Sequence, residues 1–280
     1  MPFRDAGLLK YHVFSSFDRE ELVQGTFSRH GGVSPTPWAS LNLGGTVGDE
    51  REHVVENRRR IFELFARPVE SIYDPWQAHG TEVVCVERPR PLDSLHQKAD
   101  VILTNRADVT LFMRFADCVP IVLYDPFQRV IGLVHAGWRG TVAGIAETAV
   151  KSMAAHYGCS PRNILAGIGP SICVDHYQVG EEVITAAQGS YGADASKVLW
   201  KKNGAYHFDL WTANAIVLEK SGVQTIEQAG ICTYCDNADW YSHRAEKGKT
   251  GRFGAILGLK DIGVGNDTVG SCHTEEYPAS

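Results

Sequence analysis

The chain has 280 residues, of which 44% are hydrophobic and 21% charged, a composition typical of a folded globular protein rather than a disordered one. Its 33 acidic and 27 basic residues give a formal net charge of −6, which argues against a broad nucleic-acid-binding face but allows a local cationic pocket. No apolar run approaches the ~20 residues of a membrane span, and the N-terminus lacks a signal-peptide pattern, so we expect a cytoplasmic protein with no membrane partner.

The predicted strands gather in the middle of the chain. They are rich in Val, Ile, Leu and Phe and are separated by short turns. Their almost continuously apolar composition is typical of a sheet covered on both faces. The five segments are Glu82–Glu87, Asp100–Thr104, Val109–Phe115, Pro120–Tyr124 and Val130–His135.

The predicted helices follow these strands. Apolar residues at helical spacing predict one helix over Thr141–Tyr157, and Gly158 should end it. A strand at Asn163–Ile168 and helices at Glu181–Ala187 and Leu210–Ser221 come next. Strands grouped first and helices grouped afterwards favour an α+β fold over a regularly alternating one.

Three side chains are candidates for a metal site. His79, Cys118 and His135 each adjoin Gly, Pro or Asp at the edge of a predicted strand. A hairpin between Cys118 and His135 would return the histidine close to the cysteine, whereas His79 would have to come from a neighbouring element. Three His and Cys ligands would leave the fourth position of a zinc ion open, as in catalytic zinc sites.

The spacing of these residues also allows two other interpretations. Cys118 and His135 could form a nucleophile and its base. Alternatively, Cys118 is a small buried residue and the two histidines form hydrogen bonds within turns. Spacing alone does not separate these possibilities from a metal site.

The seven cysteines do not predict a disulfide framework, because their number is odd and no export signal accompanies them. Cys232 and Cys235 have the Cys-x-x-Cys spacing of zinc and redox sites. A zinc site of this kind needs a second pair, however, and the sequence after Cys235 does not favour a helix. We therefore predict a structural role for this pair and expect Cys235→Ser to retain bound metal.

Four arginines, Arg58, Arg139, Arg244 and Arg252, lie close in sequence to these segments. Arg139 precedes the predicted helix at Thr141–Tyr157 by two residues. Backbone N–H groups at a helix N-terminus can share an anion with a neighbouring guanidinium group. The sequence therefore predicts anion binding at Arg139.

Twelve short motifs together resemble one protein family. They are Ser40–Gly44, Val47–Asp49, Asn57–Arg58, Gln77–Gly80, Ala99–Asp100, Ala116–Pro120, His135–Gly140, Ile168–Ser171, Tyr177–Gly180, Phe208–Leu210, Cys232–Thr233 and Tyr241–Arg244. Their order resembles that of the YfiH-type family, also called laccase-domain or multicopper polyphenol oxidase proteins. Members of that family are described as purine nucleoside phosphorylases.

The resemblance implies a fold and a set of site residues. The implied fold is α+β, with mixed β-sheets packed face to face and flanking helices, similar in outline to cytotoxic deamidase toxins. A single domain would cover residues 1–280. The implied catalytic residues, which are also the ligands of a zinc ion or alternatively of copper, are His79, Cys118 and His135. The candidate phosphate- and substrate-binding residues are Arg58, Arg139, Arg244 and Asn42.

The function that the resemblance implies is zinc-dependent phosphorolysis of purine nucleosides (adenosine, inosine or methylthioadenosine), with adenosine deaminase activity. The partners would be purine nucleosides and phosphate. One alternative is a hydrolase that uses Cys118 and His135 to edit cell-wall precursors. Another is a copper-dependent, laccase-like polyphenol oxidase. The oxidase fits poorly, because multicopper oxidases use His-x-His pairs and the sequence contains none.

Overall fold

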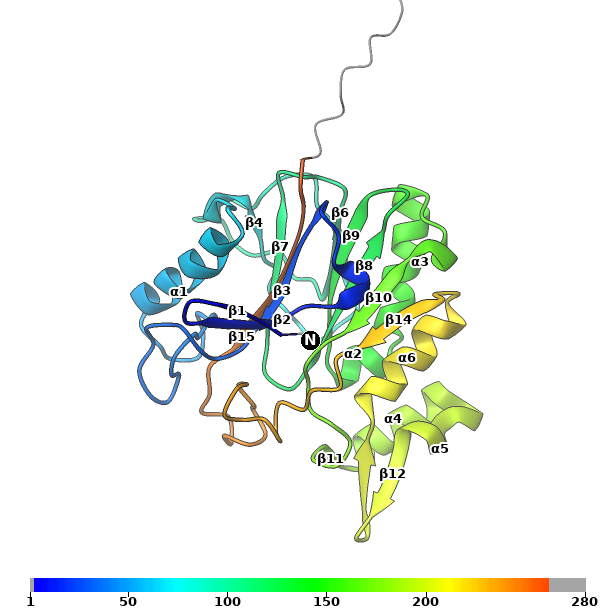
Figure 1. Cartoon of the computed structure of the whole chain (residues 1–280). Coiled ribbons are helices and arrows are strands. Elements are labelled where there is room, and N and C mark those ends of the chain that lie inside the picture. Colours follow the sequence, from blue (N-terminus) through cyan, green and yellow to red (C-terminus); the bar gives the residue numbers. More distant parts are fainter. Residues whose placement is uncertain (1–2, 262–280) are drawn as a thin grey trace, which may run out of the picture.

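Two six-stranded sheets lie face to face between layers of helices (Figure 1). A computed structural model describes residues 3–261 of the chain. The strand order is β1-β2-β3-β15-β7-β4 in the first sheet and β14-β10-β8-β9-β6-β5 in the second. A small third sheet has the order β11-β13-β12.

The strands of the three sheets have the following bounds. The first sheet contains β1 (Phe3–Ala6), β2 (Leu9–His12), β3 (Leu22–Phe27), β4 (Ile72–Tyr73), β7 (Thr110–Phe115) and β15 (Phe253–Leu259). The second contains β5 (Val83–Cys85), β6 (Val101–Thr104), β8 (Val119–Asp125), β9 (Val130–Ala136), β10 (Leu165–Ile168) and β14 (Thr225–Gln228). The third contains β11 (Gln178–Val179), β12 (Leu199–Lys202) and β13 (Ala205–Phe208).

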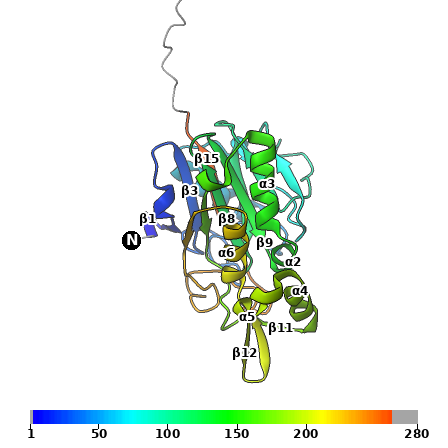
Figure 2. The ribbon, with the colours of Figure 1, turned by 90° about the vertical axis from the view of Figure 1, so that its right-hand side faces the viewer.

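Helices cover the outer faces of both large sheets. They are α1 (Arg51–Leu64), α2 (Trp138–Val142), α3 (Ile145–Tyr157), α4 (Glu181–Tyr191), α5 (Ala195–Val198) and α6 (Leu210–Lys220). Helix α1 packs on the first sheet, and α3 and α6 pack on the second. Figure 2 shows α3 and α6 lying across the second sheet, with α4, α5 and the third sheet at one end of the molecule.

The alternation of side chains along β7 explains the layering. Leu111, Met113 and Phe115 point into the core between the two sheets, while Phe112 points outward and packs in the same cluster as Phe62 of α1. Both faces of the strand are therefore apolar, as expected for a sheet covered on both sides.

The same alternation in β9 brings a histidine to the edge of the core. Ile131 and Leu133 belong to the core between the sheets, and His135 lies two residues further on the same face. Val130 and Val134 point the other way, into the core beneath the helices. The candidate site thus begins where the apolar layer between the sheets ends.

The predicted fold class is confirmed, since the sheets are mixed, stacked and flanked by helices within one domain. The five predicted strands in the middle of the chain correspond to β5 to β9. The single helix predicted over Thr141–Tyr157 is wrong, because Gly144 has a left-handed conformation (φ +76°) and separates α2 from α3. Gly158 (φ +70°) ends α3 as predicted. Among residues 3–261, no helix combines the length and apolarity that crossing a bilayer requires.

Candidate metal centre and cavity

The β8–β9 hairpin brings Cys118 and His135 together. In its antiparallel register Pro120 pairs with His135, so Cys118, just before β8, lies beside the end of β9. The ligand atoms of His79, Cys118 and His135 all lie within 4.8 Å of one another. The structure therefore brings the three predicted residues into one cluster, with the hairpin geometry expected from the sequence.

Asp100 brings His79 to this cluster. Its fully buried carboxylate accepts hydrogen bonds from the backbone N–H groups of Ala78 (3.1 Å), His79 (3.1 Å) and Gly80 (2.8 Å). His79 itself has a left-handed backbone conformation (φ +60°), which is costly for a residue with a side chain. The three hydrogen bonds hold the loop between β4 and β5 in that conformation.

Asp100 also orients His135. The ring Nδ1 of His135 lies 2.7 Å from a carboxylate oxygen of Asp100, so this nitrogen donates a hydrogen bond to the carboxylate. The other ring nitrogen, Nε2, is then the atom that can bind a metal. Carboxylates of this kind commonly fix the orientation of metal-binding histidines. From the sequence, Asp100 is part of the Ala99–Asp100 motif, and its role in orienting the ligands is not predicted. The available signal was an acidic residue at the start of a buried strand.

The electrostatics of the cluster favour a thiolate at Cys118. Burial alone would raise the pKa of this thiol, but His135 and His79 lower it to about 6. Burial would likewise lower the pKa of His135, yet Cys118 and Asp100 raise it to about 9. A thiolate is the form of cysteine that binds metals and acts as a nucleophile, so the geometry is suited to either role.

The backbone at two positions, Asp117 and Gly137, helps to place the ligand side chains. Asp117 has φ +82°, and its carboxylate accepts hydrogen bonds from the Thr233 hydroxyl (2.7 Å) and the Arg244 amide (2.7 Å), which holds the neighbouring Cys118 in place. A Cβ atom on Gly137 would lie 3.2 Å from the sulfur of Cys118 and 3.0 Å from a ring carbon of His79. Any larger residue here would have to displace one of these two side chains by a few tenths of an ångström, so glycine suits this position.

The cluster faces a cavity of about 450 Å³, a size typical of small-molecule sites. Aromatic and cationic side chains surround it. The aromatic residues are Trp76, Phe115 and Tyr177, and the basic ones are Arg114, Arg244, Arg252 and His243. The cavity therefore offers flat apolar surfaces and positive charge beside the three candidate ligands.

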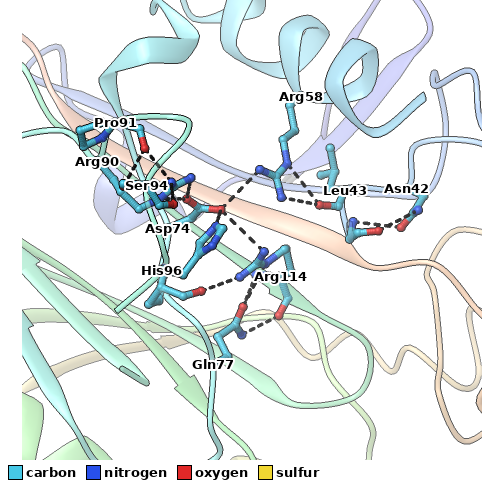
Figure 3. Close-up of polar contacts among 12 residues, drawn as sticks. Asn42, Leu43, Arg58, Asp74, Gln77, Arg90, Pro91, Ser94, His96 and Arg114 are labelled. Atoms are coloured by element: carbon cyan, nitrogen blue, oxygen red, sulfur yellow. Dashed lines mark hydrogen bonds and ion pairs between the residues drawn. The ribbon is translucent and has the colours of Figure 1, made fainter. Parts of the chain in front are cut away.

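Arg114 belongs to a buried ion network centred on Asp74 (Figure 3). The Asp74 carboxylate accepts hydrogen bonds from Arg90 (2.9 Å), His96 (3.1 Å) and Arg58 (3.4 Å), and Arg114 lies 3.6 Å away. Three guanidinium groups share one carboxylate, so the network has excess positive charge behind the cavity wall. Burial and the nearby Arg58 lower the pKa of Arg114 to about 10, which leaves it charged at neutral pH.

The predicted phosphate- and substrate-binding residues are divided between the cavity and its surroundings. Arg244 lines the cavity. Arg58 donates a hydrogen bond to the Leu43 carbonyl (3.1 Å) and lies in the Asp74 network behind the wall (Figure 3). Arg139 does not line the cavity: it lies over the ring of Trp138 with 59% of its side chain exposed.

Asn42 supports the wall from behind. It is fully buried, donates a hydrogen bond to Asp49 (2.9 Å) and accepts one from the Arg252 amide (2.9 Å). The Arg252 side chain lines the cavity and donates to the carbonyl groups of Thr250 (3.1 Å) and Gly251 (2.9 Å). Within residues 3–261, Arg252 has no carboxylate at ion-pair distance, so its charge is available to a ligand.

A second cluster lies beside Cys232 and Cys235. Cys173 and His176 come within 4.8 Å of this pair, measured between ligand atoms. The prediction that the Cys-x-x-Cys pair has no partner is therefore wrong. The partner is a Cys-x-x-His pair, which a search for a second Cys-x-x-Cys motif does not find.

Comparison with known proteins gives consistent matches. Residues 23–260 match the family described as multi-copper polyphenol oxidoreductase laccase. Purine nucleoside phosphorylase YlmD of Bacillus subtilis is 36% identical over 253 residues, which cover 87% of this chain and 91% of the relative. A purine nucleoside phosphorylase of Deinococcus radiodurans is 38% identical over 232 residues, covering 83% of this chain and 87% of the relative.

Solved structures show the same fold. The crystal structure of YlmD from Geobacillus stearothermophilus superposes with a TM-score of 0.87 at 33% identity, covering 93% of this chain and 99% of that one. A Bacillus licheniformis hypothetical protein, YfiH, superposes with a TM-score of 0.85 at 32% identity, covering 92% and 99% of the two chains.

Proposed function

The chain belongs to the laccase-domain family of YfiH and YlmD, and from this membership and the cavity we propose that it is a zinc-dependent purine nucleoside phosphorylase. The observation that supports phosphate as a substrate is Arg252, a cation with no carboxylate partner among the described residues, in the wall of the cavity beside the candidate ligands. The resemblance further suggests adenosine, inosine and methylthioadenosine as substrates, with deamination of adenosine as a second activity.

The donor set of His79, Cys118 and His135 fits zinc. Imidazole and thiolate are common zinc ligands, and three of them leave one coordination position open to water or substrate. Asp100 holds His135 in the tautomer that zinc requires. When bound, zinc supplies a Lewis acid and a water molecule of lowered pKa at the cavity. The same donors also suit copper, so the metal must be identified by analysis of the purified protein.

The remaining residues have roles in binding and orientation. In phosphorolysis, phosphate attacks C1′ of the ribose while the purine departs, and positive charge develops on the sugar. Arg252, Arg244 and Arg114 surround the cavity and would hold the phosphate in place for this attack. Trp76, which is half exposed at the cavity, offers a flat surface on which a purine can stack.

A second candidate function is a hydrolase that uses Cys118 as the nucleophile. The observation that favours it is the chain of contacts from Asp100 to His135 to Cys118, together with the lowered pKa of Cys118. Such an enzyme would need Cys118 free of metal and would ignore phosphate. The phosphate dependence of the products therefore separates the two functions.

The experiment is a phosphate titration with adenosine as substrate, with the products separated by chromatography. In Arg252→Gln, loss of one charge-assisted contact of about 1.5–3 kcal/mol should lower kcat/KM for phosphate about ten- to a hundredfold. Deamination of adenosine uses water and should change much less. Similar losses in both reactions, or none in either, would contradict a phosphate-binding role for Arg252.

Two further variants make the comparison specific. Arg106→Ala is the matched control, because Arg106 pairs with Asp108 on the surface before β7, at the opposite end of that strand from the cavity. It should behave like the wild type. Arg139→Ala tests the sequence-based proposal for Arg139, since a larger loss of phosphate use than in Arg252→Gln would place the anion nearer to Arg139.

A further inference from the structure

Two chain segments that are far apart in sequence meet at one end of the second sheet. Strands β10 and β14 are parallel neighbours, so the segments that follow them leave the sheet at the same edge. A parallel bridge between Ser171 and Cys232 continues this pairing beyond the strands. Cys173 and His176 follow β10, and Cys232 and Cys235 follow β14. The topology therefore places a Cys-x-x-His pair against a Cys-x-x-Cys pair.

The side chains of these four residues converge. The Nδ1 atom of His176 lies 3.3 Å from the sulfur of Cys173, 3.4 Å from that of Cys235 and 4.0 Å from that of Cys232. In a tetrahedral zinc site, bond lengths of about 2.3 Å to sulfur and 2.0–2.1 Å to nitrogen place a nitrogen about 3.6 Å from each sulfur. The cluster has nearly the dimensions of such a site before any ion is added.

The groups around the cluster also favour a metal. The backbone N–H groups of Cys173 and Cys235 both donate to the sulfur of Cys232, at 3.3 and 3.4 Å. Hydrogen bonds of this kind stabilise a thiolate, which is the form that binds zinc. The ring of Tyr234 stacks on His176 at 4.2 Å between centroids, which holds the imidazole in its orientation.

We propose that Cys173, His176, Cys232 and Cys235 form a second zinc site, with a structural role. Four protein ligands complete a tetrahedron and leave no position for a substrate, which is typical of structural zinc. A disulfide is a poorer account of the cluster, because it would leave one of the three thiols and the histidine without a role. The evidence for this site does not depend on the proposed enzymatic activity.

The second site would stabilise one wall of the cavity. Tyr177, the residue after His176, lines the cavity, and the guanidinium group of Arg244 lies 5.2 Å from its ring. Arg244 also donates hydrogen bonds to the carbonyl groups of His176 (3.4 Å) and Gln178 (3.1 Å). A zinc ion at His176 would join this segment to the segment of Cys232, which continues toward Arg244.

The test is the zinc content of the purified full-length protein and of variants of each site. We expect two zinc ions in the wild type, one in Cys118→Ala, one in Cys235→Ser and none in the double variant. Cys85→Ala is the control and should retain two, because Cys85 lies in β5 outside both clusters. Reconstitution of metal-free Cys118→Ala with Co²⁺ should give thiolate-to-cobalt absorption and tetrahedral ligand-field bands, both absent from the double variant.

The outcomes distinguish the two sites. If Cys118→Ala contains no zinc while the wild type contains one ion, the second site is refuted and the cavity site stands. If Cys235→Ser retains two ions, the second site is also refuted. If the wild type contains one ion that only Cys235→Ser loses, the second site stands and the cavity site fails.

An alkylation measurement does not require a Cys235 variant to fold. The side chain of Cys235 is exposed, so an unbound thiol at this position should react readily with iodoacetamide. In Cys118→Ala we expect Cys235 to be protected until a chelator removes the zinc, with the modified residue identified by mass spectrometry. Rapid alkylation before chelation would overturn the proposal.

Discussion

Asp100 accepts four hydrogen bonds, one from the ring of His135 and three from the backbone of the loop that contains His79. One buried carboxylate thus positions two of the three candidate metal ligands. The third candidate ligand, Cys118, is positioned instead by the adjacent Asp117. The Asp117 carboxylate accepts hydrogen bonds from the Thr233 hydroxyl and from the backbone N–H of Arg244. The positions of the ligands therefore depend on two aspartates, Asp100 and Asp117, that are not themselves among the candidate ligands.

Replacing Asp100 tests this dependence directly. In Asp100→Asn, the amide group cannot accept all four hydrogen bonds, so both histidines lose part of their orientation. Changes in such outer partners typically weaken metal affinity 10–100-fold. Competition with a zinc chelator should show this lower affinity at the cavity site, which is the site whose zinc is also lost in Cys118→Ala. Asp108→Asn is the control, because Asp108 is exposed and pairs with Arg106 on the surface. Equal affinities in the two variants would remove Asp100 from the site.

His12 provides a pH-dependent contribution to stability. Burial lowers its pKa to about 4, and its Nδ1 atom has no hydrogen-bond partner among the described residues. The unfolded chain, with a histidine pKa near 6.5, binds a proton at higher pH than the folded chain does. The contribution of neutral His12 to the free energy of unfolding is therefore fully present above about pH 6.5. It is lost as the pH falls toward 4, and amounts to about 3 kcal/mol.

The matched variant is His12→Phe, since His12 already packs edge-on against Phe3 and Phe14. Urea unfolding gives the free energy of unfolding at pH 7 and at pH 4.5. Its decrease between the two pH values should be smaller in this variant than in the wild type. The same pH dependence in both proteins would mean that His12 does not titrate as the buried geometry requires.

At the scale of helices and strands, the break between α2 and α3 depends on Gly144. Its φ of +76° is unfavourable for residues with a side chain, although a Cβ atom would find nothing closer than 3.8 Å. Gly144→Ala should therefore destabilise the protein by about 1 kcal/mol through the backbone alone. Gly189→Ala should do the opposite, because Gly189 lies within α4 with open space around it, and alanine favours a helix by about 1 kcal/mol.

Thermal unfolding of the two alanine variants measures this difference. The melting temperature should fall for Gly144→Ala and rise for Gly189→Ala. If both variants melt above the wild type, the left-handed conformation at Gly144 is not required. The break between α2 and α3 would then be contradicted in favour of the single continuous helix expected from the sequence.

The elements that the sequence predicted correctly are those whose pattern is local. Strands β5 to β9 are short apolar runs joined by short turns, and each can be recognised by itself. Strand β15 pairs with β3, from the opposite end of the chain, and both contain glycine, which weakens the strand pattern. The break at Gly144 was missed because the apolar spacing continues across it.

The candidate site likewise contains contacts that sequence spacing indicates and contacts that depend on the fold. Spacing alone suggested that a hairpin joins Cys118 and His135. His79 was a candidate because it adjoins glycine at a strand edge, but spacing gave no reason for it to reach the other two residues. No spacing rule connects His176 with Cys235, because their contact depends on the parallel pairing of β10 with β14. Contacts of this kind become visible only when the order of the strands is known.

At the scale of the whole molecule, the cavity lies where the layer between the two sheets ends. The first sheet contributes Arg114 from β7, and Arg252 lies directly before β15. The second sheet contributes Cys118 and His135 through the β8–β9 hairpin. Stacking of the sheets thus brings cations from one and the candidate metal ligands from the other to a single cavity. This arrangement is the basis of the proposed phosphorolysis.

The most direct test is the formation of ribose 1-phosphate from adenosine by the wild type, Cys118→Ala and Cys85→Ala, with and without inorganic phosphate. We predict that the wild type and Cys85→Ala form ribose 1-phosphate and adenine only when phosphate is present. Cys118→Ala should lose this activity at least about a hundredfold, since it loses a ligand of the catalytic metal. Ribose 1-phosphate formation by Cys118→Ala at the wild-type rate, or release of adenine by the wild type without phosphate, would contradict the account.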